Sequence, residues 1–400
     1  MTKKNNETIL LNLGYGTFAK KTAKATRTFA EHSSWVTNDL IKINDVLILE
    51  PNSSHLEDGR KFWGIAKSNC FTTFDKLINS SKLCNVSKII VRETGPNKTR
   101  FENICLLNEI ANKNGIELYG LFEKPLVLTS DELYELYSGF YQPFFCNLQE
   151  KYSPVIDTLY EQLTNNKLFI NKIYTFRGNG MYFSHILGLE RNGLDAVGSL
   201  FDKGLHDIDW ILFILEKLGS RRIFIKGIES TANIVDGNDL ENYASLEVIT
   251  TRGPVEILLR SSWLGVNFEI IESDIDSLET GATQLLYEIS KKNLYQEQIS
   301  SNSVHEGRFA IISTLDINKE RGPVYFLNFL PRPGIELKCI KIAKSCINHL
   351  PVKKNNPYLR NLIRGMNYLV RNQKNFEQDF DSHTIMFELL ENHSSKKIVA

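Results

Sequence analysis

The sequence predicts two domains: an α/β domain built on a parallel sheet, then an α+β domain whose open, mostly antiparallel sheet carries helices on one face. Two patterns predict this. Over about 150 residues short apolar strands alternate with helical segments, whereas after Glu150 β-rich segments follow one another with turns between them. A chain of 400 residues with 42% hydrophobic content is also long enough for two packed cores. We therefore expect residues 1–149 to form the first domain and residues 150–400 the second.

Composition limits the classes of partner. The chain carries 47 basic and 47 acidic residues, which gives no electrostatic signature of binding to nucleic acid or to an anionic membrane. No segment approaches the roughly 18 apolar residues of a membrane span. The six cysteines contain no C-x-x-C pair, which is typical of reduced packing thiols. We expect a cytoplasmic protein with a small-molecule partner and no bound metal.

The first strand leads into a glycine turn. The apolar segment Ile9–Leu13 is followed at once by Gly14-Tyr15-Gly16-Thr17-Phe18-Ala19 and a helical segment to about Phe29. Strand, glycine turn and helix is the order in which dinucleotide-binding folds place a pyrophosphate at a helix N-terminus. The pattern also fits an ordinary strand-to-helix turn. We take residues 14 to 18 as the predicted dinucleotide contacts, which implies a Rossmann domain.

The next strands end in further candidates. The second strand, residues 45–50, ends at Glu50, whose carboxylate could bind the ribose hydroxyls and would disfavour a 2′-phosphate. This predicts NAD, with NADP as the alternative. The third strand, residues 86–92, leads into a loop containing Thr94, Pro96 and Asn97 at the carboxyl end of the sheet, where open α/β folds bind ligands.

A lysine follows another strand. The segment Glu117–Phe122 continues directly into Glu123-Lys124-Pro125. Such a position is where cofactor and substrate would meet, although a lysine at a strand end is more often simply solvated. Glu123 and Lys124 are predicted cofactor contacts, and Lys124 is also a candidate catalytic residue.

Three titratable residues share one predicted helix within residues 193–215. Asp202, His206 and Asp209 are spaced by four and three residues, so on an α-helix they project from one face. A histidine beside a carboxylate can exchange a proton near neutral pH. The alternative is a helix whose acids complement its dipole, with a histidine hydrogen-bonded in the core.

These motifs together resemble the Gfo/Idh/MocA family, the glucose-fructose oxidoreductase and inositol dehydrogenase type. The resemblance rests on Glu-Lys-Pro at 123–125, preceded by G-x-G-x-x-A and followed by D-x-x-x-H-x-x-D at 202–209. Lys151-Tyr-Ser-Pro154 stands where the family often has Arg-Phe-x-Pro, and Tyr358–Leu369 stands where it has a late helix. Three departures concern the substrate pocket: Arg100 replaces the histidine of Pro-Asn-x-x-His, Lys151 replaces an arginine, and Val197-Gly198-Ser199 replaces a glycine triplet.

The resemblance implies hydride transfer between a nicotinamide and a carbinol or carbonyl carbon of a sugar, nucleotide sugar or cyclitol. Lys124, Asp202 and His206 match the family's catalytic residues. We expect these three, with Lys151 and Tyr182, to contact substrate. Two other functions stay open: reduction of an imine or another C=N or C=C bond on the same fold, and a non-catalytic, dinucleotide-binding regulator.

The second domain contains several β-rich segments: residues 168–176, 222–228, 246–251, 254–261, 267–271, 308–315 and 324–329. Their local pairing predicts the antiparallel sheet, with the helix of Asp202 and His206 on one face. Apolar residues occupy positions that point to both faces of the predicted sheet. The face without helices would therefore expose apolar side chains. We therefore expect a homodimer or homotetramer built through this sheet, with Trp263 and Phe268 in the interface.

Overall fold

The computed structural model describes residues 7–38, 40–139, 144–180, 198–219, 224–235, 238–262, 268–278, 280–295, 304–329, 337–343, 346–353, 356–371, 377–391 and 393–397. The chain divides into two compact units, residues 1–149 with 356–381, and residues 150–355 with 382–400. Tyr182 and Trp263 lie outside the described residues, as does the side chain of Phe268.

The first unit contains a parallel sheet. Its strands are β1 (Glu7–Leu13), β2 (Ile43–Leu49), β3 (Cys70–Phe71), β4 (Val86–Glu93), β5 (Glu117–Phe122) and β6 (Phe144–Cys146). Among the described residues they form a six-stranded sheet in the order β3-β2-β1-β4-β5-β6, and every pairing is parallel. This order reverses between β1 and β4, so the carboxyl ends of these two strands open a crevice of the kind that binds dinucleotides. The predicted Rossmann domain is confirmed.

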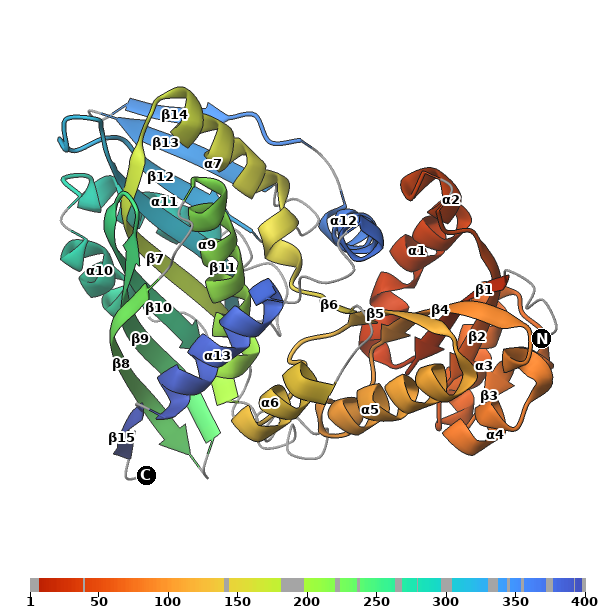
Figure 1. The fold of residues 1–400 in the computed structure, drawn as a ribbon. Coiled ribbons are helices and arrows are strands. Elements are labelled where there is room, and N and C mark those ends of the chain that lie inside the picture. The colour runs from red at the N-terminus through yellow and green to blue at the C-terminus, as the bar shows by residue number, and fades with distance from the viewer. Residues whose placement is uncertain are drawn as a thin grey trace. The chain divides into compact units, whose positions relative to one another are not determined.

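Helices connect these strands (Figure 1). They are α1 (Thr17–Glu31), α2 (Ser33–Val36), α3 (Ser53–Trp63), α4 (Phe74–Ile78), α5 (Asn97–Asn114) and α6 (Ser130–Gly139), with short 3-10 turns η1 (Lys67–Asn69) and η2 (Ser81–Leu83). Helix α1 buries Ala19, Ala23 and Ala30, small residues at helical spacing, which lets it pack closely on its neighbours. Helix α3 begins at the Asn52 side-chain cap and ends at Gly64, whose φ of 65° is left-handed.

A helix from the far end of the chain belongs to this first unit. Helix α12 (Pro357–Arg371) packs beside α1, and its Tyr358 hydroxyl accepts a hydrogen bond from Arg92 Nε at 3.1 Å. The sequence analysis placed all residues after 149 in the second domain. The structure instead assigns residues 356–381 to the first unit, and the hydrogen bond between the buried Arg92 and Tyr358 is one of the contacts that hold α12 there.

The second unit contains a mixed, mostly antiparallel sheet. Its strands are β7 (Phe169–Gly180), β8 (Phe224–Val235), β9 (Asn238–Thr250), β10 (Gly253–Ser262), β11 (Val304–Leu315), β12 (Val324–Asn328), β13 (Lys338–Ala343), β14 (Cys346–Leu350) and β15 (His393–Lys397). In the described part of the chain the order is β14-β13-β12-β11-β7-β10-β9-β8-β15. Only the β7–β10 and β8–β15 pairings among these are parallel. The predicted fold class is therefore confirmed.

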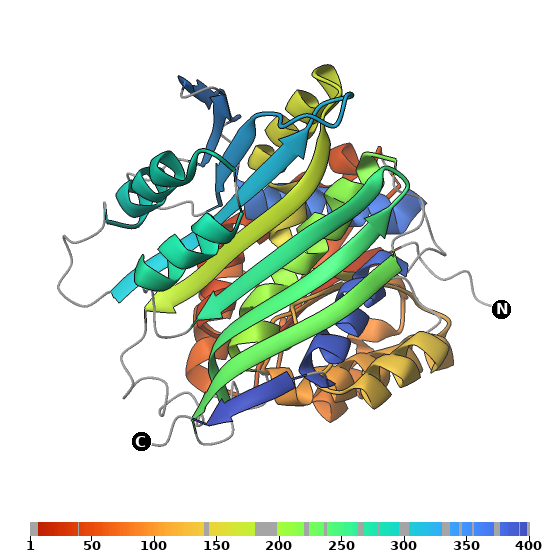
Figure 2. The same ribbon diagram turned by 90° about the vertical axis from the view of Figure 1, so that its left-hand side faces the viewer.

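Helices lie on both faces of this sheet (Figure 2). The helices of this unit are α7 (Pro154–Asn165), α9 (Leu205–Lys217), α10 (Phe268–Ser277), α11 (Thr283–Tyr295) and most of α13 (Glu377–Glu391), with the short turns η3 (Gln149–Tyr152) and η5 (Leu200–Gly204). The strand predicted at residues 267–271 was wrong over residues 268–271, which begin α10. Ile271, Ile275 and Leu278 recur at helical spacing and are buried.

Helices α10 and α11 cover the apolar part of the face that the sequence analysis left exposed. Their Ile271, Ile275 and Leu286 pack in one core cluster with residues of β7, β10, β11, β12 and β13. The expectation of helices on one face only was therefore wrong. A partner chain is not needed to bury this cluster, since the chain covers it itself.

None of the helices that the structure describes is long and apolar enough to cross a membrane.

Candidate functional site

The glycine turn of the first unit can only be built with glycine at its first position. Gly14 has φ of 82°, and a Cβ added there would lie 2.9 Å from the backbone nitrogen of Gly95. Its N–H donates to Leu49 at 2.9 Å, and its carbonyl accepts from Thr94 Oγ1 at 3.0 Å. Predicted site residues Gly14 and Thr94 therefore join the ends of β1, β2 and β4 into one loop cluster.

The N-terminus of α1 fits an anionic group. Gly16 is the N-cap, no side chain caps the helix, and no acidic residue stands in its first turn. A Cβ added to Gly16 would meet nothing within 4 Å. Thr17 and Phe18 are exposed in the first turn, and the Phe18 ring lies 6.0 Å from that of Tyr358. Uncapped N–H groups and the helix dipole favour a pyrophosphate here, so these residues fit a dinucleotide.

Glu50 stands directly after β2 and is 7% exposed. Its Oε2 accepts the backbone N–H of Tyr15 at 2.6 Å, and its Oε1 accepts that of Asn52 at 2.8 Å. The Tyr15 ring is buried with Ala19 and Ile48, and this burial raises the pKa of its hydroxyl to about 12. Glu50 therefore lies beside the glycine turn, as predicted for a ribose ligand, and it also fixes that turn.

Arg100 stands where the family that this sequence resembles has a histidine. Its guanidinium is buried. It donates to Glu93 Oε2 at 2.5 Å, to Asn97 Oδ1 at 2.9 Å, and to the carbonyls of Gly95 at 2.9 Å and Pro125 at 2.5 Å. Predicted residues Pro96 and Asn97 begin α5 beside it. The substitution thus has a structural role, because one side chain links the loop after β4 to the loop after β5.

Lys124 is half-buried just after β5, and its peptide bond to Pro125 is cis. The preceding Glu123 is buried and accepts a hydrogen bond from Asn147, whose side-chain oxygen in turn accepts from Asn361 of α12. Burial raises the pKa of Glu123 to about 7, although the Asn147 bond and the charge of Arg92 act in the opposite direction. Glu123, predicted as a cofactor contact, is thus an internal group beneath the lysine loop.

In the second unit, Asp202 and His206 lie where a π-helical turn meets an α-helix. The π turn η5 covers residues 200–204, and α9 begins at Leu205. A π turn is wider than an α turn and is frequent at functional sites. Both side chains are mostly buried, each residue being 9% exposed.

Asp202, His206 and Asp209, which were expected to project from one helical face, each contact a different charged side chain. Asp202 Oδ2 lies 2.7 Å from Lys203 Nζ, whereas His206 Nδ1 lies 2.7 Å from Glu150 Oε2. Asp209 Oδ1 accepts from Lys151 Nζ at 3.1 Å.

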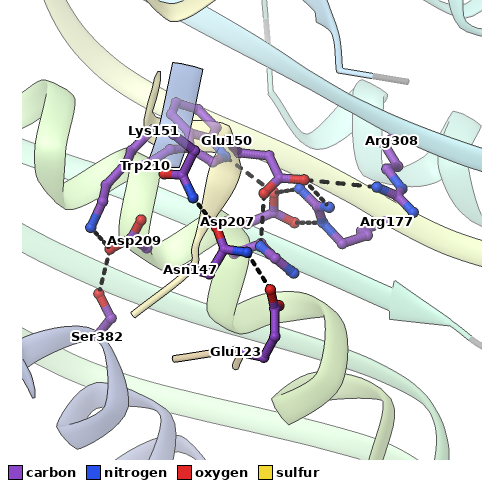
Figure 3. Close-up of polar contacts among 12 residues, drawn as sticks. Glu123, Asn147, Glu150, Lys151, Arg177, Asp207, Asp209, Trp210, Arg308 and Ser382 are labelled. Atoms are coloured by element: carbon purple, nitrogen blue, oxygen red, sulfur yellow. Dashed lines mark hydrogen bonds and ion pairs between the residues drawn. The ribbon is translucent and has the colours of Figure 1, made fainter. Parts of the chain in front are cut away.

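Glu150 is the centre of a buried ionic network (Figure 3). Its Oε1 accepts from Arg177 at 2.8 Å and lies 3.8 Å from Arg308, while Arg177 also donates to both oxygens of Asp207, at 2.9 and 3.2 Å. Burial would raise the pKa of Glu150, but Arg177, His206 and Arg308 outweigh this and hold it well below the usual value. Glu150 is therefore a carboxylate that stays ionised beside the imidazole.

Lys151 has a structural position. It is 3% exposed, and its partner Asp209 also accepts from Ser382 Oγ at 3.4 Å. Figure 3 shows these three side chains as one chain of contacts. The geometry gives no support to the predicted contact of Lys151 with substrate, because its ammonium group is committed to an internal ion pair.

Sequence reasoning missed the residues that support the predicted ones: Asn147, Glu150, Arg177, Asp207, Arg308 and Asn361. A weak signal existed for Glu150, which precedes the Lys-Tyr-Ser-Pro motif, and for Asp207, which follows His206. Arg177, Arg308 and Asn361 carry no local pattern, since only contacts between distant segments of the same unit bring Arg177 and Arg308 to Glu150 and Asn361 to Asn147.

Comparison with solved structures shows the same fold at low sequence identity. KijD10, a 3-ketoreductase from Actinomadura kijaniata solved with NADP and TDP-benzene, superposes with a TM-score of 0.64 at 12% identity, covering 98% of this chain and 100% of that one. Biliverdin reductase from Synechocystis sp. PCC 6803, with biliverdin and NADP+, has a TM-score of 0.57 at 10% identity, covering 96% and 98%. Apo scyllo-inositol dehydrogenase from Lactobacillus casei has a TM-score of 0.56 at 12% identity, covering 98% and 96%.

No protein-family model and no curated protein matches this sequence. The likeness therefore lies in the order of strands and helices rather than in shared residues. Its structural neighbours are Gfo/Idh/MocA-type enzymes, and the chain has the fold of NAD(P)-dependent oxidoreductases of this type.

Proposed function

We propose that this protein is an NAD(P)-dependent oxidoreductase that interconverts an alcohol and a carbonyl group. The observation that carries the proposal is the placement of His206: a mostly buried imidazole held 2.7 Å from an ionised carboxylate, on a chain whose other unit has the sheet order and glycine turn of a dinucleotide-binding domain. A buried histidine with an ionised partner is suited to exchange a proton near neutral pH.

The roles follow from the chemistry of each group and from the resemblance. A bound nicotinamide supplies or takes up the hydride. His206 takes the proton from the substrate hydroxyl during oxidation and returns it during reduction. Lys124 donates a hydrogen bond to the substrate oxygen and stabilises its negative charge. Asp202 binds a neighbouring hydroxyl of the substrate.

The substrate that we propose is a sugar, nucleotide sugar or cyclitol. The presence of both Asp202 and His206 supports an alcohol or ketone over an imine, because an alkoxide oxygen must exchange a proton with a neighbouring base. Neighbours with this fold include a 3-ketoreductase and an inositol dehydrogenase, but also biliverdin reductase, so reduction of a C=N or C=C bond is the second candidate. A non-catalytic regulator would have no need for all three proposed catalytic residues.

The test compares catalysis with stability in the same preparations. We expect His206→Ala and Lys124→Ala each to lower single-turnover hydride transfer about 10²- to 10⁴-fold. The affinity of His206→Ala for dinucleotide should barely change, and Asp202→Asn should have a smaller or substrate-dependent effect. Substrates are found by mass spectrometry of ligands released from freshly purified protein and by the nicotinamide absorbance with polyols.

Three results would argue against this function. If the variants lost activity only in step with a lowered melting temperature, the three residues would be structural. Near wild-type hydride transfer by a folded His206→Ala protein would exclude the histidine as proton carrier. If the fluorescence of NADH did not change when protein was added, the proposed binding of the dinucleotide would be excluded.

We also propose a homodimer or homotetramer that uses the sheet of the second unit. Because α10 and α11 cover its apolar cluster, contacts would have to use uncovered strands such as β9. On that face β9 carries Glu241, Ser245 and Glu247 together with Tyr243 and Ile249, so the interface would combine polar and apolar side chains. Light scattering at micromolar concentration tests this, and a monomeric mass would overturn it.

A further inference from the structure

We propose that Glu150 determines which nitrogen of His206 carries the proton: the carboxylate accepts Nδ1–H, and Nε2 is left to exchange the proton with substrate. Glu150 is then a positioning residue, one that acts through the histidine without touching the reacting atoms. The inference rests on the proposed function only for the identity of the reaction. The tautomer itself can be measured without substrate.

The first step is the geometry of the contact. His206 Nδ1 and Glu150 Oε2 are 2.7 Å apart, and both side chains are mostly buried. A carboxylate that is ionised can only accept hydrogen bonds. At this distance the pair is stabilised when the nitrogen facing the carboxylate carries hydrogen, and in the neutral imidazole the lone pair then lies on the other nitrogen.

The second step is that Glu150 has a fixed orientation. Its other oxygen, Oε1, accepts from Arg177 at 2.8 Å, and Arg177 is itself held by both oxygens of Asp207. Asp207 Oδ1 also accepts the indole N–H of Trp210 at 3.1 Å. One oxygen of the carboxylate is thus held between Arg177 and Arg308, which leaves the other oxygen facing the imidazole.

The third step is to compare Glu150 with the other charged groups around the histidine. The titratable side chains on the described elements of this region are the following: Asp202 and Lys203 of η5, Asp207 and Asp209 of α9, Glu150 and Lys151 of η3, Arg177 of β7, Arg308 of β11 and His383 of α13. Asp202 contacts Lys203, Asp207 contacts Arg177, and Asp209 contacts Lys151. Glu150 is the carboxylate that lies 2.7 Å from His206 Nδ1.

The proton balance follows. During oxidation the substrate O–H bond breaks and its proton forms a bond to Nε2, so the imidazole becomes a cation. The negative charge of Glu150 stabilises that cation at the Nδ1 side, and reduction reverses the step. Arg177, His206 and Arg308 together hold the pKa of Glu150 well below its usual value, so the carboxylate does not take the proton from Nδ1.

Glu150→Gln makes a sharp test because an amide has one accepting and one donating end. Arg177 can only donate, so the amide oxygen must face Arg177 and the amide nitrogen must face His206. Nδ1 then has to accept, and the ring proton moves to Nε2. The variant keeps the shape of the side chain and reverses the tautomer of the histidine.

The measurement is ¹⁵N NMR of the histidine rings, with the His206 signals identified by their loss in His206→Ala. In the wild-type protein we expect the neutral ring to be protonated at Nδ1. In Glu150→Gln we expect protonation at Nε2, and hydride transfer about 10²- to 10⁴-fold slower, because the base is then blocked by its own proton.

Asp274→Asn is the matched control. Asp274 of α10 is also a buried carboxylate bound by an arginine, with Arg260 at 2.8 Å and the Tyr174 hydroxyl at 3.0 Å, but it belongs to the covered outer face of the sheet. This variant should lower the melting temperature as Glu150→Gln does. The His206 signals and the pH profile of hydride transfer should stay as in the wild type.

Protonation of wild-type His206 at Nε2, or an unchanged tautomer in a folded Glu150→Gln protein, would overturn the inference. If Glu150→Gln does not fold, the wild-type spectrum alone decides it. A protein with Nδ1–H in the wild type but no hydride transfer to any polyol would contradict the proposed function and leave the role of Glu150 intact.

Discussion

The backbone N–H of Tyr15 donates to the carboxylate of Glu50 at 2.6 Å, which joins the glycine turn to the end of β2. The second oxygen of Glu50 accepts from Asn52 at the start of α3. One carboxylate therefore fixes two backbone segments at the place where a Rossmann domain holds the adenosine ribose. Glu50 should therefore affect both the shape of the glycine turn and the choice of cofactor.

Glu50 should make the protein prefer NAD(H) to NADP(H), because a 2′-phosphate beside an ionised carboxylate is repelled. Glu50→Gln should narrow the preference, since the amide removes the charge and keeps one acceptor for Tyr15. Fluorescence titration of both cofactors against both proteins measures this. Equal or tighter binding of NADPH by the wild type would remove Glu50 from the ribose role.

Gly14 and Gly16 should respond differently to alanine. Gly14→Ala should destabilise the first unit by at least about 1–2 kcal/mol, because its φ of 82° is left-handed and the new Cβ meets the Gly95 backbone. Gly16 has φ of −70° and open space around it, so Gly16→Ala should lower the free energy of unfolding by under about 1 kcal/mol. It should still weaken dinucleotide binding at the α1 N-terminus. Chemical denaturation and cofactor titration of both variants separate the two effects. Similar destabilisation by both would contradict the geometry.

Glu123 should make the stability of the first unit depend on pH. The pKa of the Glu123 carboxyl is near its ordinary value of 4.5 in the unfolded chain and about 7 in the folded protein, so between these values the folded protein binds more protons. Its free energy of unfolding therefore falls as the pH rises, by up to about 3 kcal/mol above pH 7.

In Glu123→Gln this fall between pH 5 and pH 8 should largely disappear, because the amide does not titrate. Denaturation series at several pH values for the two proteins give the comparison. If the free energy of unfolding of the wild-type protein changed with pH in the same way as that of Glu123→Gln, the pKa of Glu123 would be an ordinary one.

Arg100→Ala should destabilise the first unit by about 3–5 kcal/mol, because it leaves the fully buried carboxylate of Glu93 without its guanidinium. The control is Arg27→Ala, which removes an exposed ion pair with Glu31 and should cost about 1 kcal/mol or less. Melting curves and dinucleotide titrations of both variants measure the difference. Equal, small losses would mean that the Arg100 network contributes little.

The sequence alone determined the elements whose signals are local. Apolar segments ending in glycine, glutamate or lysine marked β1, β2 and β5, and the glycine turn needed only its neighbours to be recognised, since backbone conformation at Gly14 is a property of that residue. Helical spacing would also have identified α10, where β-rich composition was misread as a strand at Ile271.

Only the tertiary structure decided which side chains partner the predicted ones. Asp202, His206 and Asp209 are spaced for one helical face, yet they contact three different charged side chains, Lys203, Glu150 and Lys151. Burial requires each charge to find an opposite charge or a hydrogen bond, and the choice depends on strands that are distant in sequence. For the same reason α12 joins the first unit and α10 covers the sheet: long-range packing, which no local pattern encodes, chooses their partners.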